Sequence, residues 1–140
     1  MIADIFFDTN ILVYAYAGHE PRKQAVAGDY IADAFRHGIG VVSVQVLNEF
    51  VVNASKKLLP AMTLRQAQGE MELFASGMRV VSLDVSDVWA AVRLAQEHQI
   101  NYWDALVLAS AEKAKCRTLL TEDLTHNRKY GTVRAVNPFK

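Results

Sequence analysis

The sequence predicts an α/β fold in which a central, mostly parallel sheet of about five short strands is flanked by helices in a three-layer arrangement. Short apolar runs alternate along the 140-residue chain with longer segments whose apolar residues recur at helical spacing, which is typical of parallel sheets covered by helices. The expected strands are almost continuously apolar, as strands buried on both faces are. Because the length suits one domain and no linker or repeat is visible, we expect residues 1–140 to form a single domain.

The first half of the chain is expected to contain, in order, strand 2–7, helix 10–17, helix 22–37, strand 38–43, helix 44–58 and helix 63–76. The first strand is apolar apart from Asp4. Gly38 follows the second helix, and glycine often ends a helix because it adopts the left-handed conformation without strain. Leu47 and Val51 fall near one face of the third helix, and Thr63 is placed to cap the fourth.

The second half is expected to contain, in order, strand 79–83, helix 85–99, helix 103–115, strand 117–121 and strand 132–136. Asn137 and Pro138 end the last strand, because proline cannot donate a hydrogen bond to a sheet. Cys116 is the only cysteine in the sequence, so an internal disulfide is excluded and a reducing compartment is indicated. We interpret it as a small residue near the start of a strand.

Charge and hydropathy bear on the partners and the location of the protein. Lysine plus arginine and aspartate plus glutamate each number 15, so the formal net charge is zero, and a nucleic-acid partner would have to meet a local basic patch. No apolar run approaches the ~20 residues needed to cross a bilayer, and the N-terminus lacks the segments of a signal peptide. We therefore expect a cytoplasmic protein.

Four acidic residues stand at the expected carboxyl edge of the sheet. Asp8 directly follows the first strand, and Asp123 follows the fourth. Glu49 lies on the helix after the second strand, and Asp104 lies in the first turn of the last helix. Ligands of open α/β sheets bind beyond the carboxyl ends of the strands, so we expect these four carboxylates to converge on one cleft.

A cluster of four carboxylates requires a counter-charge. Two unit charges ~7 Å apart at an effective dielectric of ~20 repel by about 2.4 kcal/mol. No lysine or arginine lies close in sequence to Asp8 or Asp104, whereas an all-oxygen site suits Mg²⁺ or Mn²⁺. Such an ion lowers the pKa of a bound water and holds a phosphate oxygen, which is the chemistry of phosphodiester hydrolysis.

Each acid also has a simpler structural interpretation. Asp8, or its neighbours Thr9 and Asn10, could cap the first helix. Asp104 stands three residues after Asn101, as in a capping box with aspartate in place of glutamate. Asp123 could lie in a capped short turn, and Glu49 could face solvent on its helix.

Several short motifs occur in a particular order: DTN at residues 8–10, NE at 48–49, YWDA at 102–105, LLTEDL at 119–124 and NPF at 137–139. In this order and spacing they resemble the PIN-domain family, and within it the VapC-type toxins of bacterial toxin–antitoxin pairs. The likeness covers essentially the whole chain. It implies a Rossmann-like PIN domain with the activity of a metal-dependent endoribonuclease.

The resemblance also implies a site, a cofactor and partners. The catalytic and metal-holding acids would be Asp8, Glu49, Asp104 and Asp123, with Mg²⁺ or Mn²⁺ as the ion. Supporting polar positions that orient the acids or water would be Thr9, Asn10 and Thr121. The substrate would be RNA, and the protein partners would be a small antitoxin that blocks the cleft and a second copy of the chain. For the homodimer we expect contacts from apolar helical residues that need not all fit one small core, namely Tyr14, Tyr16, Phe50 and Leu58.

Three other functions stay open. A haloacid-dehalogenase-like phosphatase also places an aspartate after its first strand, but it needs an aspartate and a threonine where this chain has Asn10 and Leu12. A PIN-like module that binds RNA or a partner without cutting usually lacks one of the acids, and all four are present here. A metal-dependent nuclease that acts on DNA is not separated from a ribonuclease by the sequence.

Other residues near the expected cleft have two interpretations each. Trp103 could stack on a base, although we favour a core or dimer contact. His126 could touch substrate, although we favour an ordinary surface histidine. Basic residues that could grip phosphates are Arg128, Lys129 and Arg134 near the cleft rim, with Lys56 and Lys57 farther away.

Overall fold

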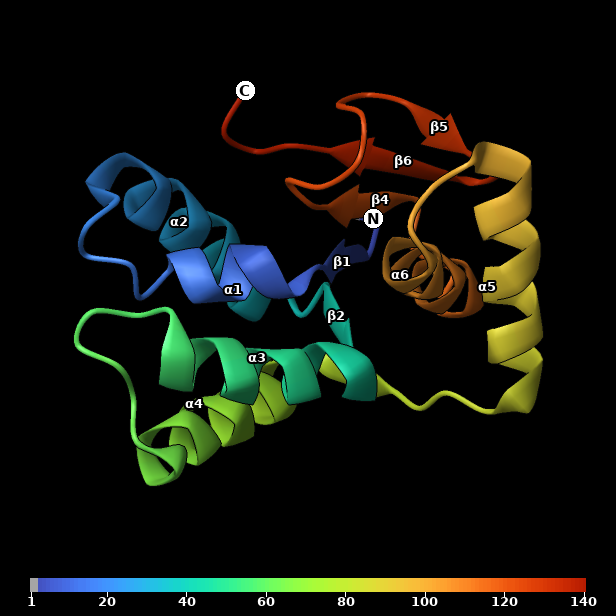
Figure 1. Cartoon of the computed structure of the whole chain (residues 1–140). Coiled ribbons are helices and arrows are strands. Elements are labelled where there is room, and N and C mark those ends of the chain that lie inside the picture. Colours follow the sequence, from blue (N-terminus) through green and yellow to red (C-terminus); the bar gives the residue numbers. More distant parts are fainter. Residues whose placement is uncertain (1–2) are drawn as a thin grey trace.

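A computed structural model, which describes residues 3–140, confirms the α/β fold (Figure 1). The strands are β1 (Ile5–Phe7), β2 (Gly40–Ser43), β3 (Arg79–Val81), β4 (Thr118–Leu120), β5 (Lys129–Tyr130) and β6 (Val133–Val136). The helices are α1 (Thr9–Tyr14), α2 (Pro21–His37), α3 (Val44–Lys56), α4 (Leu64–Gly77), α5 (Val85–His98) and α6 (Tyr102–Lys113). Among the described residues, no helix has the length and apolar character needed to cross a membrane.

The strands form one six-stranded sheet in the order β3-β2-β1-β4-β6-β5. All neighbouring strands are parallel except β5 and β6. Figure 1 shows α1 and α2 on one side of β1 and β2, with α5 and α6 on the other. Contacts of α3 with α1 and α4, and of α6 with β2, β4 and β6, complete the layers on the two faces.

The sequence predicts about five strands, and the structure corrects this by adding a sixth, β5. Lys129–Tyr130 is too short to carry a periodic pattern, and it forms a strand because Gly131, with φ of 63°, turns the chain so that Tyr130 pairs with Val133. Residue 2, which the expected first strand includes, lies outside the described residues. The other element ends agree within a few residues, and Gly38 ends α2 in the left-handed conformation as predicted.

Helix capping explains where two further helices begin. The Thr63 hydroxyl accepts a hydrogen bond from the backbone N–H of Gln66, and the Gln66 side-chain oxygen accepts one from the backbone N–H of Thr63, so the predicted cap is confirmed. Asn101 accepts from the backbone N–H of Trp103, and α6 therefore begins at Tyr102.

The four apolar residues proposed for a dimer contact do not form an exposed patch. Phe50 and Leu58 are buried in the core of the single chain. Tyr16 packs on Phe50 with ring centroids 5.8 Å apart, and the hydroxyls of Tyr14 and Tyr16 both donate to glutamate side chains. The interpretation is wrong because α1, α3 and α4 meet to form one aromatic core that accommodates these residues.

Candidate metal centre

Asp8 lies where β1 ends and α1 begins, and it is both a helix cap and a buried carboxylate. Its backbone is extended, and its Oδ1 accepts a hydrogen bond of 2.7 Å from the backbone N–H of Thr9. Its Oδ2 accepts a second bond of 2.7 Å from the Thr121 hydroxyl. Only 6% of Asp8 is exposed. The capping interpretation is therefore correct, but it leaves unexplained why a charged residue rather than asparagine is buried here.

The register of the sheet brings the second acidic segment to the same edge. β1 and β4 pair in parallel with Phe7 opposite Leu120, so Asp8 and Thr121 leave neighbouring strands side by side. The Thr121 hydroxyl also accepts from the backbone N–H of Asp123 at 3.1 Å. A single threonine thus fixes the positions of both acids.

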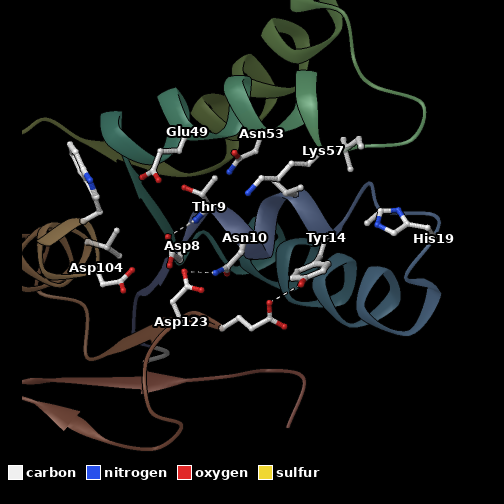
Figure 2. A pocket seen from close by; sticks show the side chains of 16 residues that line it. Asp8, Thr9, Asn10, Tyr14, His19, Glu49, Asn53, Lys57, Asp104 and Asp123 are labelled. Carbon is white, nitrogen blue, oxygen red and sulfur yellow. Dashed lines mark hydrogen bonds between the residues drawn. The ribbon is translucent and has the colours of Figure 1, made fainter. Parts of the chain in front are cut away.

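Asn10 also holds Asp123 in position (Figure 2). Its Nδ2 donates a hydrogen bond of 2.9 Å to Asp123 Oδ2. The Oδ1 of Asn10 and the Oγ1 of Thr9 are buried and have no hydrogen-bond partner among the described residues. Buried polar atoms are rarely left unpaired, so these two oxygens mark a polar part of the cleft wall that lacks partners within the described residues.

Asp104 completes a group of three carboxylates. It lies in the first turn of α6, which packs on the sheet, and one oxygen each from Asp8, Asp104 and Asp123 lie within 4.8 Å of one another. We call these three residues the aspartate cluster. Its donors are all hard carboxylate oxygens, which is the ligand set that Mg²⁺ and Mn²⁺ prefer, so the residues present fit such an ion.

Glu49 lines the same cleft but does not belong to this group. It projects from α3, and Figure 2 shows its carboxylate directed toward the side of the cleft that holds Asp8 and Asp104. Its Oε1 accepts a hydrogen bond of 2.8 Å from Gln45 Nε2. Direct coordination of a metal by Glu49 stays a prediction.

The carboxylates hold protons more tightly than usual. Burial raises the pKa of Asp8 to about 7, although the bonds from Thr121 and Thr9 oppose the shift. Burial also raises the pKa of Asp104 to about 6, and the charges of Asp123 and Glu49 add to it. Partial burial likewise raises the pKa of Glu49 and of Asp123. These shifts all have the sign expected of crowded acids without a counter-charge, and a bound cation would oppose them.

The aspartate cluster lies in a cleft of about 420 Å³. Lys57 lines this cleft, whereas Arg128, Lys129 and Arg134 are not among its lining residues, so the expected placement of the basic residues is wrong. The sequence did contain a signal for Lys57. It follows Glu49 and Asn53 at intervals of four residues, which places all three near one face of a helix.

Of the two further candidate residues, Trp103 lines the cleft and His126 does not. Trp103 is 60% exposed and lines both the cleft and the adjoining groove between α3 and α6, so its interpretation as a core residue is wrong. His126 accepts a hydrogen bond of 3.0 Å at Nδ1 from the backbone of Asn137 and does not line the cleft.

A family model described as PIN domain matches residues 5–131. No curated protein matches the sequence.

Several solved structures share the fold. A toxin–antitoxin complex from Klebsiella pneumoniae is 23% identical, with a TM-score of 0.67 over 96% of this chain and 98% of that one. VapBC2 from Rickettsia felis, bound to a DNA fragment from its promoter, is 19% identical, with a TM-score of 0.65 over 94% of this chain and 96% of that one. VapC20 from Mycobacterium tuberculosis, described as a Sarcin-Ricin loop cleaving toxin, is 16% identical, with a TM-score of 0.64 over 83% of this chain and 87% of that one.

Proposed function

Since the chain belongs to the PIN-domain family, we propose that it is a metal-dependent endoribonuclease that serves as the cytoplasmic toxin of a toxin–antitoxin pair. In this proposal residues 1–140 form a single domain. The observation that carries the proposal is the aspartate cluster, in which three carboxylates from separate segments meet at the carboxyl edge of the sheet. The structural neighbours that are named as toxins or toxin complexes support the biological role.

In this proposal Asp8, Asp104 and Asp123 hold Mg²⁺ or Mn²⁺, and Glu49 either joins them or steers water. When bound, the cation supplies positive charge that balances the carboxylates, favours ionisation of water and stabilises charge on a phosphate oxygen. Thr121 and Asn10 keep the aspartates in position through the bonds described above. The burial of Asp8 excludes water from one side of the site and strengthens electrostatic interactions there.

Glu49 has the properties of a proton acceptor for this reaction. It is half-buried, it faces the cleft from α3, and partial burial raises its pKa from the ordinary glutamate value. A carboxylate with a raised pKa accepts a proton more readily from a water that attacks phosphorus. The Gln45 amide holds the carboxylate at the cleft wall.

The proposal predicts the chemistry of the product ends. Water attacks the phosphorus, the bond from phosphorus to the 3′ oxygen breaks, and the products carry a 5′-phosphate and a 3′-hydroxyl. Ligation-based sequencing of RNA fragments made by the purified protein with Mg²⁺ measures this. Fragments that end in a 2′,3′-cyclic phosphate would show that the ribose hydroxyl attacks instead, and the hydrolytic mechanism would be wrong.

An antitoxin is the proposed protein partner. Two of the similar structures are described as toxin–antitoxin or VapBC assemblies. In this chain the groove between α3 and α6 adjoins the cleft through Glu49 and Trp103, so a partner seated there could cover the acids. A small reading frame beside the gene, whose product copurifies with the chain and inhibits it, would support this partner.

We also predict a homodimer, with contacts that differ from those expected from the sequence. Val85, Trp89 and Val92 are exposed on one face of α5, by 62%, 66% and 39%. An exposed apolar face often marks an interface, and two-fold pairing is the commonest assembly. Light scattering at tens of micromolar should give the mass of a dimer, and Trp89→Glu should lower it. A monomer mass for the wild-type protein would contradict the prediction.

A further inference from the structure

We propose that Lys57 is the residue that binds substrate phosphate in the cleft, at a phosphodiester next to the one that is cut. The inference rests on the proposed nuclease function and specifies how an acidic cleft holds an anionic substrate. The charges that line the cleft are unbalanced. The lining of the cleft includes five carboxylate side chains, Asp8, Glu49, Asp104, Glu122 and Asp123, and within the described part of the chain Lys57 is its sole lysine or arginine.

Lys57 is held at the base of its side chain and free at the tip. It is the C-terminal cap of α3, where its backbone N–H donates a 2.7 Å hydrogen bond to the carbonyl of Asn53. Figure 2 shows its amine extended into the cleft toward Asn10 and Asn53. No carboxylate within residues 3–140 lies within 4.0 Å of the amine, although the side chain is exposed in a cleft rich in carboxylates.

Lys23, a second lysine in the same region, forms an ion pair within the protein and so differs from Lys57. Lys23 Nζ bonds to Glu122 and also to the Tyr14 hydroxyl, at 3.3 Å in the latter case. The charge of Lys23 is thereby paired within the protein. The amine of Lys57 keeps its hydrogen-bond donors available for a ligand.

The charge of Lys57 reaches the acids without direct contact. It lowers the pKa of Glu49 and of Asp123, against the larger raising effect of burial in both cases. Lys57 and the aspartate cluster also line the same cleft, so a nucleic-acid strand with one phosphate at the cluster would carry a neighbouring phosphate toward the amine. Lysine serves such contacts as a compact point charge that neutralises one phosphate.

A different role would be that of a permanent counter-charge for the acids. These two roles predict opposite results. As a counter-charge, Lys57 would matter for the stability of the free protein and little for RNA affinity. As a phosphate ligand, it matters for RNA affinity and little for the stability of the free protein.

The test compares Lys57→Ala and Lys57→Arg with Lys56→Ala, which removes the same charge from the adjacent exposed residue that does not line the cleft. Binding of a fluorescent, mixed-sequence single-stranded RNA is measured by anisotropy with Ca²⁺ over a range of salt concentrations. Cleavage of total bacterial RNA with Mg²⁺ is measured in parallel. Lys57→Ala should bind RNA about tenfold more weakly than the wild-type protein. The slope of log K against log salt concentration should become shallower by about 0.7, the value for one phosphate contact to a single strand. Lys57→Arg should restore most of both.

The outcomes separate this inference from the proposed function. If the wild-type protein cleaves RNA and Lys57→Ala binds RNA as Lys56→Ala does, with the same salt dependence, Lys57 is not a phosphate ligand and the nuclease function stands. If the wild-type protein neither binds nor cleaves RNA, the proposed function is wrong and this inference with it. Equal losses in the two alanine variants would indicate a general charge effect and would also overturn the assignment to Lys57.

Discussion

Asp8→Asn is expected to reduce RNA cleavage by at least about a hundredfold, the scale of losing one main electrostatic element of an active site. The metal-free variant should nonetheless be as stable as the wild-type protein, or more stable by ~1–2 kcal/mol. Asparagine caps a helix about as well as aspartate, so the bond from Thr9 to the side chain can be kept. Removing the charge relieves both the cost of burying it and the repulsion from Asp123 and Glu49.

Metal titration gives this variant its clearest readout. Mg²⁺ or Mn²⁺ should raise the melting temperature of the wild-type protein, because the ion binds the folded site and not the unfolded chain. The Asp8→Asn variant should lose most of that rise. Asp33→Asn is the matched control, because Asp33 is an exposed residue on α2 outside the cleft. Equal metal-induced shifts in all three proteins would mean that Asp8 is not a ligand.

A second large effect is expected in the dependence of stability on pH. The metal-free protein should become less stable as the pH rises, whereas the stabilisation by metal should grow. The pKa of Asp8 rises from 3.8 to about 7 on folding, and that of Asp104 rises to about 6. A carboxyl group whose pKa is raised by folding stabilises the folded state while it keeps its proton, and that contribution is lost as the pH rises through the folded-state pKa. The melting temperature in EDTA should therefore fall from about pH 4 to about pH 7 through these two groups.

Metal binding should show the opposite trend. The ligands bind as carboxylates, so protons compete with the ion at low pH, and the melting temperature gained from Mg²⁺ should grow over the same pH range. Melting curves with and without EDTA measure both trends, and Asp8→Asn should flatten each of them relative to Asp33→Asn. A gain from Mg²⁺ that does not change between about pH 5 and about pH 8 would contradict the assignment of these acids as ligands.

Some of this site follows from sequence and topology. Asp8 and Asp123 each follow an apolar strand, and neighbouring parallel strands end at one edge of the sheet, so their meeting could be predicted. Asp104 is different, because it comes from the start of a helix whose placement on the sheet depends on tertiary packing. Its membership of the cluster rested on the assumption that α6 begins at that edge, and the structure places it there.

Other features lay beyond local patterns. The burial of Phe50 and Leu58 depends on how three helices pack together, which hydrophobic spacing in one helix does not reveal. The exposure of Trp103 depends on its place in the first turn of α6, where it lines the cleft and the adjoining groove instead of the core. Lys57 could have been found from its spacing, but its free amine is visible only once the partners of the other cleft residues are known.

If the aspartate cluster cuts RNA with the help of a divalent cation, cleavage must depend on the ion. This is measured as cleavage of total bacterial RNA and of single-stranded DNA by the purified protein, in Mg²⁺ or Mn²⁺ and in EDTA. We expect RNA fragments in the presence of either ion, none in EDTA, recovery when excess ion is added back, and no cleavage of DNA. RNA cleavage that persists undiminished in EDTA, or metal-dependent cleavage of DNA with RNA left intact, would show that the protein is not a metal-dependent ribonuclease.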